Sequence, residues 1–152
     1  MSNSLYLNLL AAYEQHARPG VVSIDLPHTE ELIIHGRAVS LSFKLHENSP
    51  EDGMVICRTD LARFNESPAE DLCRLLLQAN NLWAGTGGST LGMRGEDVLI
   101  MSQARRIGSL DITMFDALLG ALCADADSWT ARLTAKPQAE LPRPESILHM
   151  RA

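Results

Sequence analysis

The chain has 152 residues, of which 45% are hydrophobic and 21% charged, an ordinary composition for one globular domain. The formal net charge of −6 argues against a nucleic-acid partner, because clustered Lys and Arg supply most affinity for phosphate backbones. No apolar run approaches the roughly 20 residues of a membrane span. The N-terminus lacks the basic and apolar regions of a secretory signal, and the three cysteines, odd in number, lie within apolar patterns. We therefore expect reduced thiols and a cytoplasmic protein.

The first third of the chain predicts one helix followed by strands. Apolar residues at helical spacing predict a helix from Ser4 to Arg18, which Pro19-Gly20 ends. Strict alternation of apolar and polar residues from Val39 to His46 predicts a half-buried strand. Three further strands are predicted at Val21 to Leu26, Glu31 to His35 and Met54 to Thr59, with a loop over Glu47 to Gly53.

An unusually apolar helix is predicted in the middle of the chain. Ser67, Pro68 and Glu70 form a helix-start signature, a capping box with proline at the first helical position. Glycines from Gly85 to Gly88 then stop the helix. Its apolar stripe is wider than one core contact needs and consists of Leu72, Leu75, Leu76, Leu77, Ala79, Leu82 and Trp83.

The sequence of the C-terminal part predicts a hairpin, a long helix and a tail. The hairpin strands are Thr90 to Met93 and Val98 to Ser102, and Asp111 is the predicted N-cap of a helix over Ile112 to Leu133. Residues 135–152 carry three prolines and predict a mobile tail with an apolar tip at 147–150. Residues 1–134 then form a single α+β domain. Three helices pack on a twisted, mostly antiparallel sheet of five to six strands in the order α-β-β-β-β-α-β-β-α.

No catalytic, cofactor or metal site emerges from these residues. The glycines at 85–88 follow a helix and precede a strand, whereas a phosphate loop places them before a helix. The five histidines show no metal-ligand spacing. A pair of Cys57 with His46 has no supporting local signature. We therefore predict a protein that is not an enzyme and needs no cofactor.

The apolar surface of the predicted elements exceeds what one small core absorbs. Two apolar helix stripes and several two-faced strands indicate an oligomer with a groove for a peptide.

Two stretches of the sequence resemble a known family. LLLQANNLWAGTGGSTLGMRGEDVLIMSQARRI at 75–107, followed by LDITMFDALLGALCADADSWTARL at 110–133, is similar to class I chaperones of bacterial type III secretion, the Tir-chaperone or CesT-like family. The shared features are the LLQAN helix end, the glycine turn with TLG, a strand ending in basic residues, and the Leu110-Asp111, Phe115 and Ala126-x-x-Trp129 positions. The resemblance covers roughly residues 3 to 134.

The resemblance implies a homodimer in the bacterial cytoplasm that keeps secreted effectors soluble and competent for secretion without hydrolysing ATP. The N-terminal segment of the effector would bind in extended form, partly by strand addition. A secretion ATPase is a further candidate partner. The dimer interface would include Leu72, Leu75, Leu76, Ala79 and Trp83. Effector binding would fall to Leu5, Leu9, Val39, Leu41, Phe43, Val98 and Ile100.

Two other hypotheses compete with this one. The first is a regulatory binding protein on the same scaffold that sequesters a secretion or transcription regulator. The second is a small-ligand enzyme built on the glycine loop and the Cys57–His46 pair.

Overall fold

The computed structural model describes residues 4–81 and 85–135, apart from the side chains of residues 50 and 51. Trp83 and nearly all of the predicted tail lie outside the described residues. The elements in chain order are α1 (Ser4–His16), β1 (Val21–Ser23), α2 (Leu26–Thr29), β2 (Glu31–Ile34), β3 (Arg37–His46), β4 (Ser49–Arg63), α3 (Glu70–Asn80), β5 (Thr90–Arg94), β6 (Val98–Arg106), a 3-10 turn (Ile107–Ser109) and α4 (Ile112–Thr134). This order confirms the predicted α+β fold and adds one short helix, α2.

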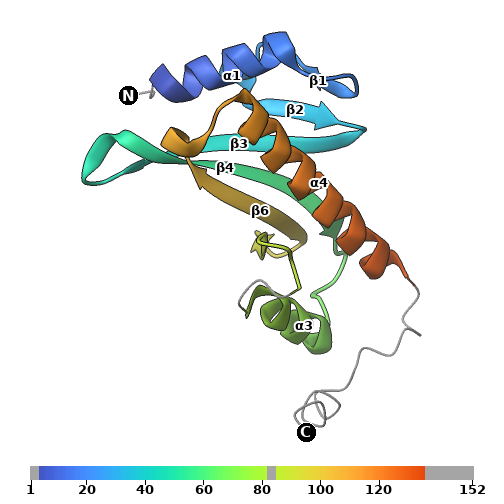
Figure 1. Cartoon of the computed structure of the whole chain (residues 1–152). Helices are drawn as coiled ribbons and strands as arrows, with labels where there is room; N and C mark the ends of the chain where they lie inside the picture. The colour runs from blue at the N-terminus through green and yellow to red at the C-terminus, as the bar shows by residue number, and fades with distance from the viewer. Residues whose placement is uncertain (1–3, 82–84, 136–152) are drawn as a thin grey trace, which may run out of the picture.

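The strands form one antiparallel sheet in the order β1-β2-β3-β4-β6-β5. Helices α1 and α4 lie on the same face of this sheet, while α3 lies apart, beside its β5 end (Figure 1). The core fills the space between the sheet and the two long helices. Its largest fully buried side chains include Leu10, Tyr13, Leu99, Met101, Phe115 and Leu119.

The β3–β4 hairpin is longer than the sequence predicts. The predicted loop over Glu47 to Gly53 is wrong, because β4 already begins at Ser49, which pairs with His46. A register shift between Leu45 and His46 accommodates the extra residues. Polar residues form strand here because the end of the hairpin projects beyond the helices and needs no apolar face (Figure 1).

The first predicted strand also ends early. It stops at Ser23, and Leu26 opens α2, so the strand to Leu26 is wrong. Asp25 adopts left-handed geometry with a φ of 52°, which breaks the strand. The Glu14 carboxylate then accepts hydrogen bonds from the Leu26 backbone N–H and the Ser23 hydroxyl, at 3.0 and 3.1 Å. A side chain of α1 therefore fixes this turn.

The predicted start of the central helix is wrong as well. Helix α3 begins at Glu70 after an N-cap at Ala69 that has no side-chain hydrogen bond. Glu70 pairs with Arg74, one turn along, at 2.6 Å instead of closing a capping box. The other end of α3 is held more firmly, because the Asn80 side chain donates to and accepts from the backbone of Leu91, both at 2.8 Å.

Helix α4 follows the prediction closely. Asp111 is its N-cap and accepts a hydrogen bond from the Met114 backbone N–H at 2.7 Å. Phe115 packs edge-to-face with Tyr13 of α1, with ring centroids 5.0 Å apart. The Tyr13 hydroxyl donates to Asp116 at 2.8 Å, so α1 and α4 are joined by both apolar and polar contacts.

Candidate binding surface

The two faces of the sheet differ in what covers them. Leu32 and Ile34 of β2 are buried under the helices, whereas Ile33 between them is 46% exposed. The same division holds on β3, where Val39 and Leu41 are buried and Ala38 is exposed, because successive side chains of a strand point to opposite faces. Among the described residues no helix packs over the second face, which we call the open face (Figure 1). Apolar side chains on the open face are therefore available to a partner.

A hollow of about 800 Å³ lies on the β1–β2–β3 side of the open face. We call it the open-face hollow. Its lining includes Val22, Ile24, Ile33, Arg37, Arg58 and Asp127. It is broad and open to solvent, a shape that suits an extended segment of polypeptide better than an enclosed small molecule.

Three exposed aliphatic side chains give the open-face hollow its apolar character. Ile24 is 80% exposed and Val22 is 59% exposed. Val22 pairs directly with Ile33 across β1 and β2, so these two side chains stand next to each other on the same face. Exposed aliphatic groups gathered in one place are typical of an interaction surface.

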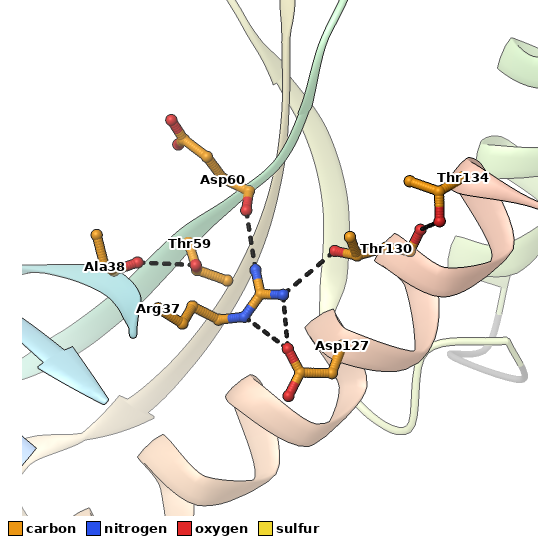
Figure 2. A network of polar contacts seen from close by, with 7 residues as sticks. All are labelled: Arg37, Ala38, Thr59, Asp60, Asp127, Thr130 and Thr134. Atoms are coloured by element: carbon orange, nitrogen blue, oxygen red, sulfur yellow. Dashed lines mark hydrogen bonds and ion pairs between the residues drawn. The ribbon is translucent and has the colours of Figure 1, made fainter. Parts of the chain in front are cut away.

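Arg37 fixes the wall of the hollow that lies between the sheet and α4 (Figure 2). Its guanidinium donates to one oxygen of Asp127 through Nε at 2.9 Å and Nη2 at 2.6 Å. It also donates to the Thr130 hydroxyl at 3.2 Å and to the Asp60 backbone carbonyl at 3.1 Å. The Arg37 side chain is only 17% exposed, whereas the Asp127 side chain is 71% exposed, so the guanidinium is shielded from water and the carboxylate is not. These hydrogen bonds join the start of β3, β4 and α4 into one rigid unit.

Two further arginines of the hollow, Arg94 and Arg58, are paired with polar groups. Arg94 forms an ion pair with Asp60 at 2.7 Å, and Arg58 donates to the Ser42 hydroxyl at 2.8 Å. These groups can rearrange their hydrogen bonds toward a polar backbone or side chain. The aliphatic cluster with a mixed polar rim has the usual anatomy of a protein interface.

Most of the residues predicted to bind a client belong to the core. Four of them are buried: Leu9, Val39, Leu41 and Val98. Phe43 is half-buried and stacks on Tyr6 of α1 with ring centroids 5.2 Å apart. Leu5 is 53% exposed, and Ile100 is half-buried on the open face, where it covers Gly92. The accessible members of the predicted set are therefore Leu5, Ile100 and part of Phe43.

The sequence reasoning missed the three residues that define the hollow, Val22, Ile24 and Ile33. A signal for Ile33 was present, because Leu32, Ile33 and Ile34 are consecutive apolar residues and one of them must face away from the other two. Ile24 carried no such signal, since its exposure follows from the turn at Asp25.

Four of the residues predicted for a dimer interface, Leu72, Leu75, Leu76 and Ala79, recur at helical spacing and share one side of α3. Leu76 and Ala79 are buried within the chain, on the side that packs toward β5. Leu72 and Leu75 are partly buried against the same core, whereas Leu77 projects from the opposite side of the helix and is 71% exposed. The outer side of α3 thus presents Leu77 to solvent. Nearby β5 presents Met93, which is 40% exposed.

The glycine loop at residues 85–88 packs against other elements of the fold and does not form a phosphate site. A Cβ on Gly87 would lie 3.1 Å from the Asp125 carboxylate, so the loop packs against a negative charge that disfavours phosphate. The Ser89 hydroxyl donates to Asp125 at 3.1 Å and accepts from Gln103 at 2.7 Å. Trp129 donates to the Gly85 carbonyl at 3.0 Å. These contacts hold the loop on α4 and β6.

The pairing of Cys57 with His46 is not formed. Cys57 lies opposite Leu41 in the sheet, five residues from His46, which is about 17 Å along a strand. Burial raises the pKa of the Cys57 thiol to about 12, so this thiol is a poor nucleophile near neutral pH. Burial also raises the pKa of Cys123. Within residues 4–81 and 85–135 no cluster of three metal-ligating side chains occurs.

The comparisons with known proteins agree with this geometry. The model of the Tir chaperone protein (CesT) family matches residues 37–130, from the start of β3 into the last third of α4. The chain belongs to this family. The match confirms the predicted resemblance to class I type III secretion chaperones. A search of curated proteins finds no match.

Two solved structures share the fold of this CesT-family chain. A chain of the ExsC–ExsE complex superposes with a TM-score of 0.55 at 16% identity, covering 85% of this chain and 93% of that chain. A chain of the HopA1–SchA chaperone–effector complex superposes with a TM-score of 0.57 at 16% identity, covering 86% of this chain and 97% of that chain. At this identity the superpositions establish the fold. None of the helices in the described ranges is long and apolar enough to cross a membrane.

Proposed function

We propose that this CesT-family protein is a non-enzymatic type III secretion chaperone that acts in the bacterial cytoplasm. It binds the N-terminal segment of one or more effectors in extended form and keeps it soluble and competent for secretion. The observation that carries this proposal is the open-face hollow with its three exposed aliphatic side chains beside the edge strand β1.

Strand β1 provides the backbone part of the proposed binding. In the described part of the chain it pairs with β2 only, so its outer edge is open to another strand. Main-chain pairing at a sheet edge tolerates many sequences, while pockets for alternate side chains give selectivity. Val22, Ile24 and Ile33 would receive the apolar side chains of the client. Leu5, Ile100 and the accessible edge of Phe43 would extend the contact along the chain.

A large surface is needed because the client segment is disordered before it binds. Ordering such a segment costs several kcal/mol, and the interface must offset that cost. A dimer doubles the available surface and lets one segment contact two copies. We propose that the dimer forms through α3, with the exposed Leu77 at the centre of the contact and the accessible parts of Leu72 and Leu75 at its margin.

Co-expression with the product of the adjacent gene tests the function. Light scattering on the purified material should show a dimer that carries the N-terminal segment of that product. The double variant Val22→Ser/Ile33→Ser should lose the client while keeping its circular-dichroism spectrum. Its matched control, Met114→Ser, removes an exposed apolar side chain of α4 and should retain the client. A monomer that binds nothing would overturn the proposal.

The same experiment separates the chaperone from the regulator hypothesis. Deleting the N-terminal segment of the captured partner should abolish the complex if the protein escorts effectors. A non-secreted partner that still binds after this deletion would favour a regulatory binding protein on the same scaffold.

A further inference from the structure

The C-terminal end of α4 lies beside the open-face hollow. Asp127 lines the hollow, and Thr130, one turn further along, accepts a hydrogen bond from Arg37, which also lines it. The helix ends at Thr134, about 10 Å beyond Asp127 along its axis. The chain therefore leaves its last described element within a short distance of this exposed apolar surface.

Seventeen residues, 136–152, follow this point in the sequence. They include one apolar cluster, Ile147-Leu148-His149-Met150. Eleven residues, 136–146, separate Ala135 from Ile147, and the twelve steps along the chain span up to about 40 Å. This reach comfortably exceeds the distance back along α4 to the hollow.

We infer that residues 136–152 occupy the open-face hollow of their own chain when no client is bound. Ile147, Leu148 and Met150 would cover Val22, Ile24 and Ile33. The inference rests on the proposed function, because it assigns regulation to the same binding surface. The segment acts as a built-in substitute for the client.

The composition of both partners fits this contact. The segment carries three basic and two acidic side chains, and the hollow is lined by three arginines and by Glu31, Asp60 and Asp127. Neither partner has the excess of one charge that would repel or dominate the other, so apolar contact decides the binding. Prolines at 137, 142 and 144 restrict the backbone and lower the entropy lost when the segment is ordered.

Tethering makes a weak contact effective. A segment joined by a short linker has an effective concentration in the millimolar range, so a low intrinsic affinity suffices to fill the hollow. A client must then displace the segment, and its apparent affinity falls by the fraction of chains in which the hollow is free. Release of the segment would accompany the arrival of a client.

Methyl NMR spectroscopy of the full chain tests the contact without any client. The double variant Ile147→Ser/Leu148→Ser should shift the methyl signals of Val22, Ile24 and Ile33. The control Gln138→Ser/Glu140→Ser changes two polar residues of the same segment and should leave those signals in place. Unchanged signals in the apolar variant would overturn the inference. Shifts at Leu77 and Met93 instead would assign the segment to the α3–β5 surface and would equally overturn it.

Mixing distinguishes the same chain from a second copy as the source of the segment. Labelled Ile147→Ser/Leu148→Ser protein is mixed with unlabelled wild-type protein under conditions that allow subunits to exchange. The variant signals should stay shifted, since its own segment cannot bind. Their return to wild-type positions would show that a partner chain supplies the segment and would contradict the proposal.

Client affinity provides the second measurement. The apolar variant should bind the client segment captured by co-expression tighter than wild type by a factor of about five or more, because the competitor is gone. Unchanged affinity together with shifted methyl signals would refute competition but leave the client function intact. If no client binds either protein, the proposed function fails, and the NMR result still decides whether the segment lies in the hollow.

Discussion

The covered and open faces of the sheet differ in solvent exposure, although the same strands build both. On β2, Leu32 and Ile34 are 2% and 3% exposed under the helices, while Ile33 is 46% exposed on the other side. The covered face pays the entropic cost of folding through burial of apolar area. The open face keeps aliphatic groups in water. This difference teaches that stability and binding can be changed separately, by substitutions one residue apart.

The largest effect is expected on the covered face. Phe115→Ala should lower the free energy of unfolding by about 3–5 kcal/mol, because the ring is fully buried and packs on Tyr13. Urea denaturation followed by circular dichroism measures the loss. The neighbouring control Met114→Ala, at a site 55% exposed, should change stability by less than about 0.5 kcal/mol. Equal effects at the two positions would mean that α4 does not pack as described.

An intermediate effect is expected where the two faces meet α4. Arg37→Met should lower the free energy of unfolding by about 1 kcal/mol, because it removes the hydrogen bonds of a largely buried guanidinium, although Asp127 is 71% exposed and can be solvated by water. Arg74→Met, which removes an exposed ion pair within α3, should cost no more than about 0.5 kcal/mol. A wild-type urea midpoint for Arg37→Met would show that this network does not hold the wall of the hollow.

Alkaline pH should lower the free energy of unfolding, because Cys57 is buried under the covered face. Burial raises its pKa from 9.0 to about 12 in the folded chain, so above pH 9 the unfolded chain loses this proton first. The stabilising contribution is therefore complete below pH 9 and is lost as pH rises from 9 toward 12, by at most about 1.4 kcal/mol per pH unit.

Urea midpoints across this range should fall less steeply for Cys57→Ala than for wild type. Cys73→Ala leaves the buried thiol in place and should keep the wild-type slope. Parallel slopes for wild type and Cys57→Ala would show that the Cys57 thiol is not shielded from solvent in the folded chain.

The smallest effect on stability, and the largest on binding, is expected at the open face. Ile33→Ser should change the free energy of unfolding by less than about 0.5 kcal/mol, since the side chain is already half in water. It should nevertheless weaken client binding measurably by calorimetry. Strong destabilisation by Ile33→Ser would mean that the open face is covered in solution, and the comparison between the two faces would no longer hold.

The sequence predicts the covered face well because periodicity reports burial. The apolar positions Val39, Leu41 and Phe43 and the stripe on α4 are packed between sheet and helices, whereas Leu45, at the projecting end of the hairpin, is 40% exposed. Asp111 acts as the N-cap because its local signal has no competitor. At Ser67 a comparable local signal is overridden: α3 begins three residues later, and Glu70 pairs with Arg74.

The open-face hollow cannot be predicted from hydrophobic periodicity, because it depends on residues far apart in the chain. Arg37 and Asp127 are separated by 90 residues, and neither position stands out in the sequence. The turn that exposes Ile24 depends on Glu14 of α1, which accepts from the Leu26 backbone. The family resemblance supplies the function class but assigns client contacts to Val39, Leu41 and Val98, which the fold buries.

The shortness of the edge strand β1 limits the association of identical chains through their sheets. An exposed sheet edge is a template on which identical chains can stack into fibrils, and the risk grows with the length of the flat edge. Strand β1 offers only three residues before Asp25 turns the chain away. So short an edge holds few main-chain hydrogen bonds, too few to propagate a cross-β assembly. The β1 edge of this sheet is therefore a poor template for stacking of identical chains.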